Sequence, residues 1–85
     1  MTLINNRMKK LKVLYFGALS ELTGRQDDFL EIEGNLHDLV DKLKSDHPGI
    51  GKKHFSIAVN QEITSGDTVL SDGDEIALLP PFAGG

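Results

Sequence analysis

The sequence predicts an α+β fold in which a mixed sheet is covered on one face by a single main helix. Three observations predict it. Short apolar runs with strand character recur along the chain, only residues 35–47 show a full helical period, and 85 residues suffice for one small domain. The composition, 39% hydrophobic and 26% charged, is that of an ordinary globular protein.

The first predicted elements are a strand, a short helical turn and a second strand. Residues 10–16 are rich in β-branched and aromatic side chains and end at a glycine. Residues 18–23 carry two leucines three positions apart and are followed by Gly24, which stops a helix. Residues 28–33 form the next strand, and their closeness in sequence to the first strand favours antiparallel pairing of the two.

The main helix begins at Asn35, a good N-terminal cap with Asp38 three residues on. Four apolar residues then fall at i, i+3, i+4 and i+7 and form one stripe: Leu36, Leu39, Val40 and Leu43. The opposite side of the helix carries polar and charged residues. Pro48 and Gly49 end the helix.

The second half of the chain predicts further strands. Residues 55–60 alternate large and small side chains, residues 61–62 form a turn, and Ile63 begins a short return strand. Residues 75–79 form the last strand, which two prolines end because proline cannot donate to a ladder. This order matches a β-grasp arrangement, in which the first and last strands lie side by side in the middle of the sheet.

We expect one folded domain over residues 8–81, between a mobile arm at residues 1–7 and a C-terminal tail at residues 82–85. The longest apolar stretch, residues 11–19, is interrupted by a lysine and is too short to span a membrane. Its basic flank resembles a signal peptide only faintly, since no cleavage site follows. We therefore expect a cytoplasmic protein.

Several functional classes are disfavoured by composition. A net charge of -4 without a basic block argues against nucleic acid or an anionic membrane as partner. The absence of cysteine excludes disulfides, cysteine-ligated metals and a cysteine persulfide. The three histidines lack the spacing of a metal pair, and residues 72–75 fit a turn better than a calcium loop, so no metal site is expected. No motif for acid–base or nucleophilic catalysis is present.

The C-terminus carries the most informative motif, two glycines shortly after two prolines. Gly84 and Gly85 have no Cβ, so their backbone can enter a channel that is too narrow for side chains. Residues 81–85 reach at most about 17 Å when extended. A free α-carboxyl is an unreactive anion at pH 7, so acyl transfer requires activation, for example as an acyl-adenylate. The sequence has no phosphate-binding loop, so a partner enzyme would supply the ATP chemistry.

Surplus hydrophobicity is the second clue to function. If the helix covers the face that carries Val13, Ile76 and Leu78, then other large apolar side chains point away from it: Leu14, Phe16, Leu79 and, from the short return strand, Ile63. A patch of this kind on a small acidic protein indicates a docking surface. The alternative is a central strand that is partly buried on both faces.

Five segments resemble the small-subunit family of molybdopterin synthase: residues 10–17, 21–24, 58–61 and 72–81 and the final two glycines. The Asp-Gly-Asp-Glu sequence, the two prolines and the Gly-Gly ending are the specific part. The resemblance runs from about Lys10 to Gly85. It implies a ubiquitin-like β-grasp fold, with one main helix on one face of a mixed sheet and a flexible Gly-Gly tail. It also implies a sulfur-carrier role.

In that family, an adenylating enzyme related to ubiquitin activators forms the acyl-adenylate on the terminal glycine, here Gly85. A sulfurtransferase system then converts the adenylate to a thiocarboxylate. The large synthase subunit receives the tail, and the sulfur builds the dithiolene of molybdopterin on cyclic pyranopterin monophosphate. Two small and two large subunits form the synthase, and the carrier has no turnover alone and binds no cofactor. The resemblance implies these partner-binding residues: Phe16, Ile63, Leu79, Pro80, Pro81, Phe82, Ala83 and Gly84.

Three alternatives share parts of this pattern. A sulfur carrier for thiazole or another thiolated product would use the same glycine chemistry. A ubiquitin-like modifier would share the fold, the tail and the activation, but would form covalent conjugates with lysine. A plain β-grasp interaction module would not depend on Gly84 and Gly85 at all.

Overall fold

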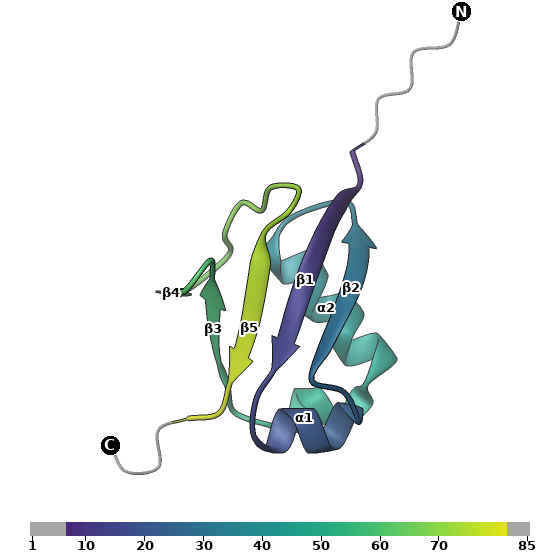
Figure 1. The fold of residues 1–85 in the computed structure, drawn as a ribbon, viewed down its shortest axis with the longest axis vertical. Coiled ribbons are helices and arrows are strands. Elements are labelled where there is room, and N and C mark those ends of the chain that lie inside the picture. The colour runs from purple at the N-terminus through teal and green to yellow at the C-terminus, as the bar shows by residue number, and fades with distance from the viewer. Residues whose placement is uncertain (1–6, 82–85) are drawn as a thin grey trace, which may run out of the picture.

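The computed structural model describes residues 7–81, which form a five-stranded mixed sheet with its main helix packed across one face (Figure 1). The second, shorter helix lies at one end of the sheet. The elements are β1 (Lys9–Tyr15), α1 (Ala18–Thr23), β2 (Asp27–Ile32), α2 (Leu36–Asp46), the 3₁₀ helix η1 (Pro48–Lys52), β3 (Ser56–Val59), β4 (Glu62–Thr64) and β5 (Glu75–Leu79).

The strand order across the sheet is β2-β1-β5-β3-β4. The first and last strands, β1 and β5, are parallel neighbours in the middle, and the other pairs are antiparallel. This confirms the predicted β-grasp fold, including the central position of β1 and β5. The parallel pair also means that β1 and β5 end at the same edge of the sheet, next to α1 (Figure 1).

The core lies between the sheet and α2. Val13 of β1, with Ile76 and Leu78 of β5, is fully buried and faces the helix, which contributes Leu39 and Leu43. These residues are the predicted stripe of the helix and one parity of each central strand. The period of 3.6 in α2 and the period of two in the strands therefore place the same core residues that the sequence predicts.

The helix caps agree with prediction. The Asn35 backbone N–H donates to the Asp38 carboxylate at 2.8 Å, which satisfies one of the free donors at the start of α2. Gly24 ends α1 in the left-handed conformation, with φ at 73°.

Two details differ from the prediction. The turn before β4 consists of Asn60 and Gln61, both with positive φ, so Glu62 already belongs to the strand. Pro48 does not simply stop α2 but begins η1, because its fixed φ suits the first position of a helix. Ile50 of η1 is fully buried, so this short helix closes the core at one end.

The predicted arm and tail fall largely outside the described residues. Residues 1–6 and 82–85 are not described, so the boundaries predicted there remain predictions. Arg7 is described and lies 3.9 Å from the Glu33 carboxylate in an exposed ion pair. Within residues 7–81, no helix is both long and apolar enough to cross a membrane.

Candidate functional site

The face of the sheet that α2 does not cover carries an apolar row across four strands. One cross-strand row on this face consists of consecutive register partners: Ile63, Ala58, Ala77 and Leu14. Ile63 is 64% exposed and Leu14 is half-buried. We call this surface, together with Phe16 and Leu79, the open face. It confirms the predicted orientation of these large side chains away from the helix.

Phe16 and Leu79 lie at the end of the open face where β1 and β5 both finish. Phe16 directly follows β1, and its backbone N–H donates to the Leu78 carbonyl at 3.2 Å, so pairing with β5 continues. The Phe16 side chain is 44% exposed, and Leu79 is half-buried. The structure therefore brings Phe16, Ile63 and Leu79 onto one face, as expected for predicted contact residues.

Pro80 lies close to Gly17 at the point where the described chain leaves the sheet. A Cβ built on Gly17 would lie 3.1 Å from the Pro80 Cγ, and Gly17 has a φ of +57°. A side chain is thus disfavoured twice at this position, by space and by conformation. Pro80 and Pro81 are exposed and follow the end of β5, where the described chain leaves the sheet (Figure 1). The remaining predicted site residues lie outside the described residues: Phe82, Ala83, Gly84 and Gly85.

The acidic turn before β5 uses its carboxylates to bind backbone N–H groups. Asp72 accepts from the Lys10 N–H, and Asp74 accepts from the Ser71 N–H, both at 2.7 Å. Gly73 between them has a φ of +89°, typical of a tight turn. These contacts support the prediction of a turn. Within residues 7–81, no group of three or more histidine and acidic side chains could hold a metal ion.

The phenol of Tyr15 has a displaced pKa. Burial, and next the nearby Asp28 carboxylate, raise the pKa of Tyr15 to about 12, because both disfavour the phenolate. Its hydroxyl has no hydrogen-bond partner within residues 7–81. Its ring packs edge to face against the His47 ring, with the two ring centroids 6.2 Å apart. Tyr15 lies on the covered face in the core, and it also lines a depression at the end of β1.

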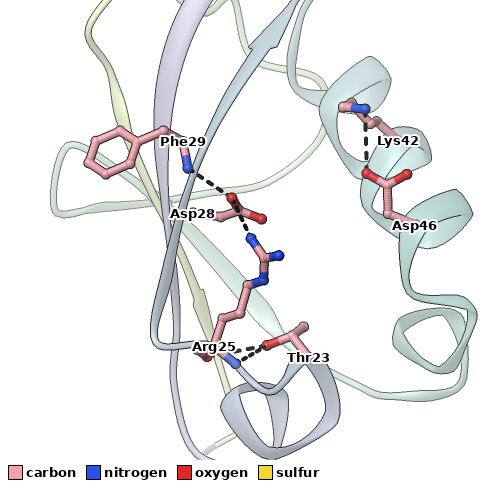
Figure 2. A network of polar contacts seen from close by, with 6 residues as sticks. All are labelled: Thr23, Arg25, Asp28, Phe29, Lys42 and Asp46. Carbon is pink, nitrogen blue, oxygen red and sulfur yellow. Dashed lines mark hydrogen bonds and ion pairs between the residues drawn. The ribbon is translucent and has the colours of Figure 1, made fainter.

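A polar network links the end of α1 to the start of β2 (Figure 2). The Arg25 guanidinium donates to the Asp28 carboxylate at 3.1 Å, and the same oxygen accepts the Phe29 backbone N–H at 3.0 Å. The Arg25 backbone N–H is in turn bound by the Thr23 hydroxyl at the end of α1. Strand β2 is an edge strand, so this network covers one of its outward donors.

Phe29 is an open-face residue that sequence reasoning did not identify. It is 73% exposed, and its ring lies on the side of β2 away from α2 (Figure 2). The Lys12 ammonium stands 5.8 Å from the ring centroid. The alternation of side chains along β2 could have identified Phe29. Leu30 pairs with Leu11 on the covered face, so its neighbour Phe29 must point to the other face.

The comparisons with known proteins agree with this geometry. Residues 13–85 match the ThiS family. A molybdopterin synthase sulfur carrier subunit from Mycobacterium tuberculosis is 40% identical over 83 residues, which cover 92% of this chain and all of that protein.

Solved structures give the same relation. A Pyrococcus furiosus protein described as molybdopterin converting factor subunit 1 superposes with a TM-score of 0.82 at 28% identity, covering 87% of this chain and 99% of that one. A Helicobacter pylori complex of subunits 1 and 2 of molybdopterin-converting factor gives a TM-score of 0.64 at 28% identity, with coverage of 89% and 99%. Small archaeal modifier protein 1 from Methanosarcina acetivorans gives 0.79 at 25% identity, with coverage of 94% and 100%. This chain belongs to the ThiS family, among the molybdopterin synthase sulfur carrier subunits.

Proposed function

We propose that this chain carries sulfur for a molybdopterin synthase on the carboxyl group of Gly85. The observation that carries the proposal is the position of the tail exit. Pro80 follows Leu79 and lies close to Gly17, the residue after Phe16, so the end of the open face that carries Phe16 and Leu79 also carries the last described residues of the chain. A partner that binds the open face there can also receive the tail. The match to the ThiS family runs through Gly85 and is consistent with this role.

The chemistry begins with an unreactive carboxylate. An adenylating enzyme of the ubiquitin-activator type joins the Gly85 carboxylate to AMP from ATP and releases pyrophosphate. A sulfurtransferase system then delivers sulfur at the oxidation level of sulfide, so that a C–S bond forms at the Gly85 carbonyl carbon, the bond to AMP breaks, AMP leaves and a thiocarboxylate results. The acyl-adenylate and the thiocarboxylate are covalent intermediates, and no bound cofactor is required. The need for ATP leads us to propose a cytoplasmic location.

The sulfur acceptor in this proposal is cyclic pyranopterin monophosphate, bound by the large synthase subunit. That subunit would contact the open face through Phe16, Ile63 and Leu79 and enclose the tail from Pro80 to Gly84. Its reaction forms the dithiolene of molybdopterin, and two charged carriers are used for each product. The Helicobacter pylori complex of subunits 1 and 2 supports a pairing of this kind. The heterotetramer of two small and two large subunits that the family resemblance implies is part of this proposal.

The intact mass of the chain tests the carrier step. The chain is incubated with ATP, the adenylating enzyme and a sulfur source, and we expect a mass gain that equals the exchange of one oxygen for sulfur. A variant that lacks Gly85 is the matched control and should show no gain, although it folds normally. An unchanged mass with a demonstrably active adenylating enzyme would contradict the proposal.

A ubiquitin-like modifier is the second candidate, and the likeness to small archaeal modifier protein 1 favours it. The two candidates share activation but differ in the product, because a modifier forms an amide bond between Gly85 and a lysine. A denaturing gel of cell extract separates them. Conjugates that depend on Gly85 would favour the modifier, and their absence together with thiocarboxylate formation would favour the sulfur carrier.

A further inference from the structure

A depression next to Phe16 is continuous with the open face. It has a volume of about 430 Å³, is open to solvent, and is bordered by the end of β1, the start of α1 and the start of β2. Its lining includes Leu14, Phe16, Gly17, Ser20, Gln26 and Asp27. Three of these residues, Leu14, Phe16 and Asp27, also belong to the open face. A protein that docks on the open face therefore covers this depression as well.

The polar part of the lining has hydrogen-bond acceptors that the fold does not use. Asp27 is the register partner of Leu14, which places it on the open face, and it is exposed. Within residues 7–81 the Asp27 carboxylate forms no ion pair or hydrogen bond, whereas its neighbour Asp28 is bound to Arg25 at 3.1 Å. The side-chain oxygens of Ser20 and Gln26 are likewise unused in the described part of the chain.

This combination fits a cationic side chain. A carboxylate and two neutral acceptors match the donors of a guanidinium or an ammonium group, and the half-exposed Phe16 ring offers a face for its cation. A neutral or acidic side chain would leave the Asp27 carboxylate without a partner inside an interface, which is unfavourable. We propose that the depression receives an arginine or lysine side chain of the protein that docks on the open face. The identity of that protein, the large synthase subunit, rests on the proposed function.

The first test compares charge changes at two exposed positions of β2. Asp27 and Glu31 lie on the same strand and the same face, but Glu31 is outside the depression. Affinity for the large subunit is measured by calorimetry for Asp27→Asn, Asp27→Lys, Glu31→Gln and Glu31→Lys. We expect Asp27→Asn to weaken binding about tenfold and Asp27→Lys to weaken it further, while both Glu31 variants stay within about twofold. Thermal unfolding should be unchanged, because the Asp27 side chain bonds to nothing in residues 7–81.

Equal losses at Asp27 and Glu31 would show an effect of net charge alone and would overturn the inference. So would wild-type affinity of Asp27→Lys. In either case the proposed function stands, because the wild-type chain still binds the large subunit.

A second test does not depend on that partner. The ¹⁵N-labelled chain is titrated with N-acetyl-arginine amide, N-acetyl-lysine amide and uncharged N-acetyl-norleucine amide. We expect saturable shifts of the Gly17, Gln26 and Asp27 amide signals with the charged probes only, and none in Asp27→Asn. The stronger of the two charged probes identifies the preferred side chain. If the wild-type chain fails to bind the large subunit, the proposed function is wrong, and this titration alone decides the inference. The absence of localised shifts would overturn the inference.

Discussion

The two faces of the sheet carry similar residues but differ in what covers them. Leu78 and Leu79 are neighbours in β5; Leu78 is fully buried under α2, and Leu79 is half-buried on the open face. The same contrast separates Val13 from Leu14 in β1. Apolar side chains at both parities of a strand normally indicate cover on both faces. Here the chain itself provides one helical layer, and in the proposed function a partner provides the other.

The difference between the faces is largest for folding stability. Leu78→Ala removes a fully buried side chain and should lower the free energy of unfolding by about 3 kcal/mol. Leu79→Ala, one residue on, should cost about 1 kcal/mol or less, because its side chain already meets solvent. Urea unfolding of both variants measures the contrast. Equal losses would show that the open face is part of the folding core.

The covered face should also make stability depend on pH through Tyr15. Its pKa is about 12 in the folded protein against 10.0 for the free side chain, so the folded state holds its proton more tightly. The contribution of protonated Tyr15 to the free energy of unfolding is fully present below pH 10. It is lost as the pH rises toward 12, by roughly 2–3 kcal/mol in total. Tyr15 is the only tyrosine, so absorbance of the phenolate reports its titration directly.

Tyr15→Phe is the control for this prediction. It should remove the additional loss of stability between pH 10 and 12 and change stability at pH 7 by less than about 1 kcal/mol, because the hydroxyl has no partner within residues 7–81. A phenolate that titrates at pH 10 in the folded protein would contradict the burial of this group.

Partner binding should show the reverse preference, with the open face more sensitive than the core. Phe16→Ala and Leu79→Asp should each weaken binding to the large subunit by about 2 kcal/mol or more, because the first removes an aromatic anchor and the second places an unpaired carboxylate in an apolar contact. Folding should be affected less than binding. Calorimetric titration and urea unfolding of the same variants test this, and a loss of stability equal to the loss of affinity would remove the distinction between the faces.

Gly17 lies close to Pro80 at the tail exit, so its replacement should affect both folding stability and partner binding. Gly17→Ala requires a side chain at φ +57° and brings it against Pro80, so we expect a loss of stability of about 1 kcal/mol and weaker partner binding. Gly66→Ala is the matched control: Gly66 also has a positive φ, but nothing lies within 4 Å of an added Cβ. It should lose similar stability and keep its affinity. Equal affinities of Gly17→Ala and Gly66→Ala for the large subunit would mean that the contact between Pro80 and Gly17 does not position the tail.

Hydrophobic periodicity predicted the fold because the period of each main element matches the side chains that this element buries in the core. The stripe of α2 depends on spacing alone, and the period of two separates Val13 and Leu78 from Leu14 and Leu79, so the covered face follows from the sequence. The extent of the open face does not. Ala58 and Ala77 lie between Ile63 and Leu14 only because of the strand register, which depends on long-range pairing. The contact of Pro80 with Gly17 also joins residues far apart in sequence, and no local pattern reports it.

The smallest effect concerns the border of the open face. Phe29 is 73% exposed on the edge strand β2, and its contact with Lys12 is worth only about 0.5 kcal/mol at an exposed site. Phe29→Ala should therefore change stability by less than about 0.5 kcal/mol, whereas Leu30→Ala, the neighbour on the covered face, should cost more. Residues at the rim of an interface contribute little, so Phe29→Ala should also alter affinity less than about threefold. A tenfold loss would place Phe29 among the anchors and extend the docking surface across the whole sheet.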